Sequence, residues 1–140
     1  MPQPRVFPGA AGPGFVSLTA DDRDVLPPRQ LPFQYRLGAR HLFGPTHAEA
    51  LFTDNETNGE AVYGRGASSR SPYTKDAFHR HVVNGEDSTN PDEVGTKAAL
   101  HYRMMVPPGQ SVELCLRFAT EFHPDPLAGV RPVQLGFVPL

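Results

Sequence analysis

Residues 96–122, TKAALHYRMMVPPGQSVELCLRFATEF, carry the clearest structural pattern in the chain. Two runs rich in apolar residues flank Pro107-Pro108-Gly109, whose dihedral preferences favour a reversal of the chain. In each run, alternate residues fall on the same face, which is typical of a strand with one buried side. The stretch therefore predicts a β-hairpin, and we expect the centre of the core at Leu100, Tyr102, Met104, Leu114, Leu116 and Phe118.

Shorter apolar runs, separated by turn residues, precede this hairpin. They predict strands at residues 15–18, 31–37, 41–43, 50–53 and 61–63. A turn around Gly44 and Pro45 is expected after the third of these strands, and residues 64–72 are too polar to be anything but an exposed loop. Short strands at this spacing are typical of an all-β fold. We expect an antiparallel β-sandwich, complete or incomplete.

The length of 140 residues fits one domain. The 16 prolines and 13 glycines interrupt the sequence too often for long helices. Residues 1–14 are rich in both, and we expect a flexible N-terminal arm that packs poorly. Residues 15–127 then form the β-sandwich domain, and residues 128–140 form a C-terminal tail.

Charge and composition narrow the classes of partner. A formal net charge of -2 and a pI near 6.3 provide no basic field for nucleic acid. No run approaches the ~20 apolar residues that a membrane helix needs, and no secretory signal is apparent. The single cysteine, Cys115, cannot form an internal disulfide and fits a reducing compartment. We therefore expect a cytoplasmic protein that binds neither nucleic acid nor membranes.

A cluster of acidic and amide residues follows the strand predicted at 50–53. It consists of Asp54, Asn55, Glu56, Asn58 and Glu60. Such side chains can hydrogen-bond sugar hydroxyls, and paired carboxylates can act as general acid and base. The same residue types also occupy turns for local backbone reasons, so turn chemistry is the alternative.

A second candidate site is His79, His81 and Glu86, in and after the apolar segment 77–83. Two histidines separated by one residue face the same side of a strand and could share a metal ion with a carboxylate. The spacing HxHxxxxE partly resembles the first motif of cupins, small metal-binding β-barrels. The alternative interpretation is a set of polar residues on the solvent side of a strand.

Cys115 is a third candidate, as a nucleophile with His101 or His123 as its base. It lies between two leucines within a predicted strand, where a thiol usually serves packing. The chain contains no glycine-rich phosphate motif, CxxC pair or HExxH motif. The residues alone therefore indicate no catalytic centre.

Three segments, in this order, resemble one known family. They are LFTDNETN at residues 51–58, YTKDAFH at 73–79 and NPDEVGTKAALHY at 90–102. Together they are similar to the N-terminal β-domain of bacterial glucosidase-like proteins, relatives of mannosyl-oligosaccharide glucosidase in glycoside hydrolase family 63. The resemblance covers about residues 37–127, and the tail at 128–140 departs from the family pattern.

The resemblance implies an antiparallel β-sandwich that packs against an (α/α)6 barrel carrying the catalytic acid and base. Nothing in the chain resembles that barrel. We therefore expect a non-catalytic portion of an α-glucosidase-type hydrolase, with the barrel as partner, no cofactor, and Asp54, Asn55, Glu56 and Asn58 touching an oligosaccharide or the barrel. The alternatives are a cupin-like metal protein and a free-standing carbohydrate-binding module.

Overall fold

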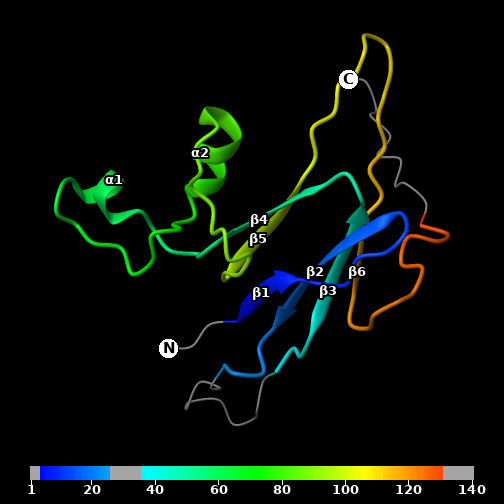
Figure 1. The fold of residues 1–140 in the computed structure, drawn as a ribbon, viewed down its shortest axis with the longest axis horizontal. Coiled ribbons are helices and arrows are strands. Elements are labelled where there is room, and N and C mark those ends of the chain that lie inside the picture. Colours follow the sequence, from blue (N-terminus) through cyan, green and yellow to red (C-terminus); the bar gives the residue numbers. More distant parts are fainter. Residues whose placement is uncertain (1–3, 26–35, 131–140) are drawn as a thin grey trace, which may run out of the picture.

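Two antiparallel sheets hold most of the regular structure (Figure 1). The structure is a computed structural model that describes residues 4–25 and 36–130. Within these residues one sheet has four strands, the other has two, and both helices are short. The all-β class predicted from the sequence is confirmed, whereas the sandwich arrangement stays a prediction.

The four-stranded sheet has the order β1-β2-β3-β6, formed by Arg5–Pro8, Phe15–Asp21, Arg40–Pro45 and Arg117–Ala119. Strand β2 lies inside the sheet, and its residues Phe15 and Leu18 are buried together with Phe43 of β3. The rings of Phe15 and Phe43 meet edge to face, with their centroids 5.9 Å apart. One half of the core is therefore an aromatic contact across two neighbouring strands.

The two-stranded sheet pairs β4 (Glu49–Thr53) with β5 (Lys97–His101). The last three residues of β4 are buried and supply the other half of the core. Val6 of β1 and Gly95 exchange two backbone hydrogen bonds of 2.7 and 3.0 Å, which joins the two sheets just before β5 begins. Gly95 lies so close to the backbone of Thr53 that a methyl group in its place would clash with the Thr53 carbonyl.

Residues 61–63 belong to helix α1 (Gly59–Tyr63), so the strand predicted there is wrong. The helix begins because the Asn58 side-chain oxygen accepts a hydrogen bond from the N–H of Ala61 at 3.1 Å. A local cap of this kind outweighs the weak strand tendency of a three-residue apolar run.

Residues 77–83 also form a helix rather than the predicted strand, α2 (Ala77–Asn84). Apolar and aromatic residues recur here at helical spacing, with Ala77 buried at the first turn. The ion pair between Arg80 and Asp76, 3.5 Å long and four residues apart, supports the same turn. Gly85 ends the helix in the left-handed conformation, with φ at 70°.

The predicted hairpin at 96–122 is half right. The chain does reverse at Pro107-Pro108-Gly109, where the N–H of Gln110 donates to the carbonyl of Pro107 at 3.1 Å. Its arms, however, end in different sheets, because β5 pairs with β4 and β6 pairs with β3. Between them, residues 102–116 project from the sheets as two extended arms (Figure 1). The turn expected at Gly44 and Pro45 is likewise displaced, because both residues lie within β3.

The predicted core is wrong as a consequence. Leu100, Tyr102 and Leu114 are half-buried, while Met104, Leu116 and Phe118 are exposed, Phe118 by 69%. The alternation in the arms is real, but the arms leave the sheets. Leu100, Tyr102 and Leu116 still pack over Gly44 of β3, whereas the residues further along the arms are exposed. The buried hydrophobic residues among those described are Phe15, Leu18, Phe43, Leu51, Phe52 and Ala77.

The N-terminal segment departs from the expected flexible arm, since Arg5–Pro8 is strand β1 and pairs along its whole length with β2. The strands predicted at 15–18, 41–43 and 50–53 are confirmed. The strand predicted at 31–37 falls mainly outside the described residues. Residues 64–72 contain neither helix nor strand, as expected for a loop.

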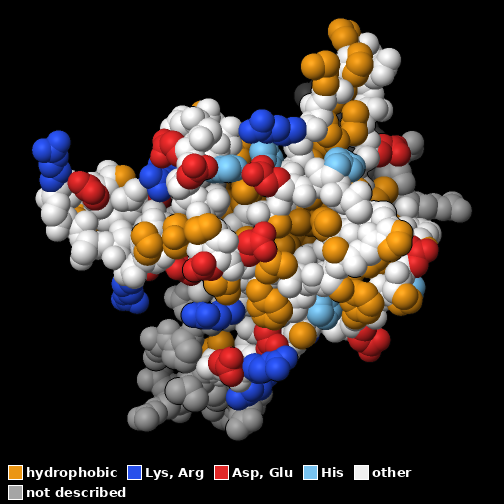
Figure 2. All heavy atoms as spheres, viewed as in Figure 1, with side chains coloured by type: hydrophobic (Ala, Val, Ile, Leu, Met, Phe, Trp, Pro, Cys, Tyr) orange, Lys and Arg blue, Asp and Glu red, His pale blue; other side chains and the backbone are white. Residues whose placement is uncertain are grey.

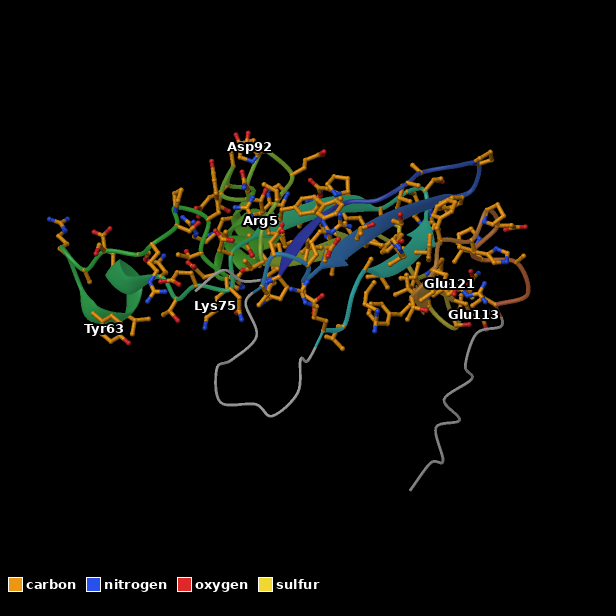
Figure 3. All side chains as sticks on the ribbon, turned by 90° about the horizontal axis from the view of Figure 1, so that it is seen from below. Arg5, Tyr63, Lys75, Asp92, Glu113 and Glu121 are labelled. Carbon is orange, nitrogen blue, oxygen red and sulfur yellow. The ribbon has the colours of Figure 1, made fainter. Side chains whose placement is uncertain are left out.

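The described part of the chain is elongated. Figure 3 shows Tyr63 of α1 near one end and Glu113 and Glu121 near the other. Neither helix in the described ranges is long and apolar enough to cross a membrane.

Candidate functional site

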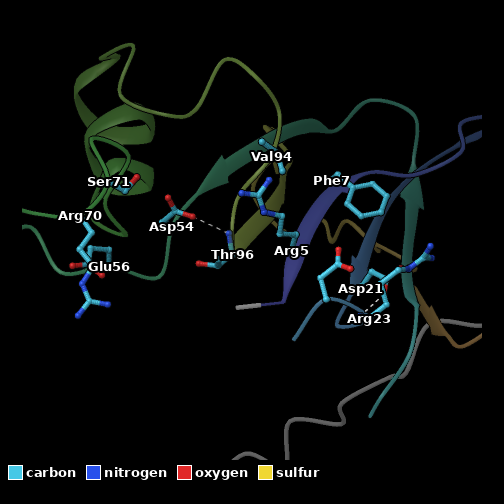
Figure 4. Close-up of a pocket in the computed structure, with 11 residues that line it drawn as sticks. Arg5, Phe7, Asp21, Arg23, Asp54, Glu56, Arg70, Ser71, Val94 and Thr96 are labelled. Atoms are coloured by element: carbon cyan, nitrogen blue, oxygen red, sulfur yellow. Dashed lines mark hydrogen bonds and ion pairs between the residues drawn. The ribbon is translucent and has the colours of Figure 1, made fainter. Parts of the chain in front are cut away.

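An open groove of about 710 Å³ lies beside the edge strand β1 (Figure 4). Its other walls come from the end of β2 and the residues after it, the loop after β4, the loop before α2 and the segment before β5. Charged side chains of both signs line it, together with the aromatic ring of Phe7. The cations are Arg5, Arg23 and Arg70, and the acids are Asp21, Asp24, Asp54 and Glu56. The groove can therefore offer many hydrogen bonds and one apolar surface to a polar ligand.

Two of the four sequence-predicted site residues, Asp54 and Glu56, line this groove. Asp54 is engaged within the protein, because its carboxylate accepts the N–H of Thr96 at 3.1 Å and its own N–H donates to the carbonyl of Tyr73 at 2.7 Å. Asn55 is exposed, and its N–H donates to the Thr96 hydroxyl at 2.8 Å. These bonds fix the loop after β4 to the start of β5.

Asn58 lies outside the groove lining and has a structural role. Its side-chain oxygen caps α1, and its amide nitrogen donates to Asp76 at 2.9 Å. Burial opposes ionisation of Asp76, but hydrogen bonds from Thr74 and Asn58 outweigh it and lower the pKa of that carboxyl. Asn58 thus connects the two helices through a charged partner.

Glu56 is the predicted residue best placed to meet a ligand. Its backbone carbonyl accepts the N–H of Lys75 at 2.9 Å, which positions the residue, and Glu56 lines the groove. Within the described residues, no hydrogen bond or ion pair engages the charged groups of Glu56, Arg5 or Arg70. Arg23 differs, because it is paired with Asp21 at 2.6 Å and lowers the pKa of that carboxyl. Glu60 is exposed on α1 and does not line the groove.

The metal site predicted at His79, His81 and Glu86 rests on a strand that does not exist. On helix α2, residues two apart point about 200° away from each other around the axis. The Glu86 carboxylate instead accepts hydrogen bonds from Arg80 at 3.3 Å and Asn84 at 2.9 Å. Across residues 4–25 and 36–130, no group of three His, Cys, Asp or Glu side chains is arranged to hold a metal ion.

Cys115 lies half-buried in the second projecting arm, away from the groove. Its suggested bases are engaged elsewhere: His101 bonds Glu49, and the His123 ring accepts the N–H of Asp125 at 3.1 Å. The arrangement gives the thiol no hydrogen-bonded base in the described structure.

Glu49 of β4 bridges two histidines in a second polar cluster, which no sequence motif indicated. Its carboxylate oxygens lie 3.0 Å from His81 Nε2 and 3.0 Å from His101 Nδ1. Glu49 and His101 face each other in the β4–β5 register, and α2 brings His81 to them. Finding this cluster would have required knowing both the strand pairing and the helix.

Part of the chain is similar to a yeast protein. A stretch of 73 residues, 51% of this chain, is 40% identical to uncharacterized protein YMR196W of Saccharomyces cerevisiae. That stretch spans only 7% of the yeast protein. No family model and no solved structure matches the chain.

Proposed function

We propose that this chain is a non-catalytic β portion of an α-glucosidase-type glycoside hydrolase, and that it supports or caps a catalytic (α/α)6 barrel. The observation that carries the proposal is the meeting of the three segments that resemble the glucosidase family. The N–H of Asp54 bonds the carbonyl of Tyr73 at 2.7 Å, and the N–H of Asn90 bonds the carbonyl of Phe52 at 2.8 Å. The resemblance therefore maps onto one assembled unit around β4 rather than onto scattered matches.

The hydrogen bonds of the sequence-predicted polar residues support a scaffold role. The sequence suggests Asp54 and Asn58 as sugar-binding residues, yet both side chains are hydrogen-bonded to neighbouring loops or helices. A catalytic carboxylate needs free access to the substrate and a partner at a set separation. Residues that fix a loop in this way are better suited to holding a surface in shape.

The exposed apolar residues of the projecting arms favour a large protein partner. Their exposed apolar residues include Met104, Met105, Val106 and Val112, and Met105 is 91% exposed. Figure 2 shows hydrophobic side chains along this projection. Apolar side chains gathered on one projection are typical of a surface that another protein unit covers. The occupant we propose is the catalytic barrel of the same assembly, and the small share of the yeast relative that this chain matches agrees with such a larger protein.

The test uses the intact yeast relative and a chimera in which the matched 73-residue stretch is replaced by the corresponding residues of this chain. We expect both proteins to release glucose from an α-glucoside with inversion, and this chain alone to release none. Absence of hydrolysis by both full-length proteins, or hydrolysis by this chain alone, would contradict the proposal.

The groove favours a second candidate function, binding of an oligosaccharide. Glu56 and Arg5 can donate or accept hydrogen bonds at sugar hydroxyls, and the Phe7 ring can stack on the apolar face of a sugar. Calorimetric titration with maltooligosaccharides should show saturable binding that Phe7→Ala and Glu56→Gln both weaken. A flat titration of the wild type would remove this candidate. A cytoplasmic location belongs to either proposal, because the lone Cys115 fits a reducing compartment.

A further inference from the structure

A hydrogen bond between His81 and Glu49 connects helix α2 to the two-stranded sheet, and His101 of that sheet bonds the same carboxylate. In Figure 1 the helix stands beside β4 and β5. His81, on the helix, lies 3.0 Å from one Glu49 oxygen, and His101, on β5, lies 3.0 Å from the other. The second nitrogen of His81, Nδ1, lies 2.9 Å from the backbone carbonyl of Glu86. One carboxylate thus joins a helix and two strands.

The partners of His81 determine its protonation state. The Glu86 carbonyl can only accept a hydrogen bond, so Nδ1 must carry a proton. An ionised Glu49 can also only accept, so Nε2 must carry a proton as well. Both bonds are therefore made only by the charged imidazolium. His101 differs, because its single bond to Glu49 requires one proton and a neutral ring provides it.

The surroundings favour this charged form. The hydrogen bond to the Glu86 carbonyl and the bond to Glu49 raise the pKa of His81. The charged groups that face His81 are Glu49 from β4, His101 from β5 and Asp87 from the loop after α2. Arg80, the neighbouring cation on the helix, is paired with Asp76 and Glu86.

We propose that Glu49, His81 and His101 form a proton-dependent clasp that holds α2 on the β4–β5 sheet and loosens when His81 becomes neutral. Loss of the Nε2 proton leaves a lone pair facing a carboxylate oxygen at 3.0 Å, which is repulsive. The helix then loses the hydrogen bond from His81 to Glu49, while the bond from His81 Nδ1 to the Glu86 carbonyl remains. This inference is independent of the proposed function.

The pH range of the clasp follows from the two pKa shifts. The pKa of His81 is raised from 6.5, so its contribution is complete below pH 6.5 and is lost as the pH rises through the higher folded value. The pKa of Glu49 is lowered from 4.5, chiefly by the hydrogen bond from His101, so its contribution is complete above pH 4.5 and is lost as the pH falls. The clasp is therefore closed between those limits.

Amide hydrogen exchange in α2, corrected for the intrinsic pH dependence of exchange, tests the clasp. We expect protection at residues 81–85 to fall up to about fivefold between roughly pH 5.5 and pH 8, the range for a partly exposed ion pair. Amides of β4 should change much less and serve as an internal reference. His79→Gln is the matched control, because His79 is exposed on the same helix and should keep the wild-type profile.

His81→Gln should give a flat profile, as should Glu49→Gln, which preserves the shape of the side chain. The second variant decides the matter if the first does not fold. Wild-type protection that stays constant over this pH range would overturn the inference. A His81→Gln or Glu49→Gln protein that keeps the wild-type profile would overturn it as well.

Discussion

Substituting alanine for two phenylalanines on neighbouring strands distinguishes the core in the structure from the core that the sequence suggested. Phe43 of β3 is fully buried, and its ring centroid lies 5.9 Å from that of Phe15 and 6.0 Å from that of Phe122. Phe118 of β6, a member of the core predicted from alternation, is 69% exposed. The chemical change is identical at the two positions, so the difference reports burial.

Phe43→Ala should lower the free energy of unfolding by about 3–5 kcal/mol, the range for deleting a buried ring and leaving a cavity. Its contacts with the Phe15 and Phe122 rings, each worth about 0.5–1.5 kcal/mol beyond burial, favour the upper half of that range. Because small domains are stable by about 5–15 kcal/mol, the variant should be marginal at room temperature. Phe118→Ala should change stability by about 0.5 kcal/mol or less.

Urea denaturation followed by circular dichroism measures both changes. The free energy of unfolding should fall with urea concentration at the same slope for each variant. Equal losses at the two positions would show that the arms and β6 are buried against a layer, as in the predicted hairpin core. A larger loss for Phe118→Ala would refute the burial argument outright.

Three further predictions concern local structure. Asn58→Ala should destabilise α1 by about 0.5–2 kcal/mol, since Ala61 loses its cap; faster exchange of the Ala61 amide would show it, and unchanged exchange would count against the cap. Gly95→Ala should lower the free energy of unfolding by roughly 1–3 kcal/mol, because the methyl group meets the Thr53 backbone, and an unchanged free energy of unfolding in urea denaturation would contradict that packing. The pKa of Asp76 is lowered from 3.8, so its contribution is complete above that value and is lost as the pH falls; Asp76→Asn should therefore make acid unfolding less steep, as measured by circular dichroism.

Local sequence signals located several elements correctly. The apolar runs predicted β2, β3 and β4, and the Pro-Pro-Gly sequence predicted the reversal at Pro107. These features depend on residues close in sequence, whose dihedral and burial preferences act at short range. The all-β class followed from the same signals.

The two helices were missed for different reasons. Helix α1 depends on one Asn58 cap, and five residues are too few for periodicity to show. Helix α2 has exposed valines on its last turn, which disguised the helical period as a strand-like run. The metal hypothesis failed with that error, since spacing is meaningful only in the correct element.

Strand pairing explains both the misplaced core and the fate of the candidate site. Alternation in residues 98–106 and 112–118 identifies strand-like segments but does not say which strand each will join. When β5 joins β4 and β6 joins β3, the arms between them leave the sheets, and their apolar side chains become surface. The same pairing sets Thr96 against the loop after β4, where it engages Asp54. A carboxylate that looks catalytic in sequence thus joins two segments 42 residues apart, while Glu56, two residues further on, lines the groove without a hydrogen bond to its side chain among the described residues.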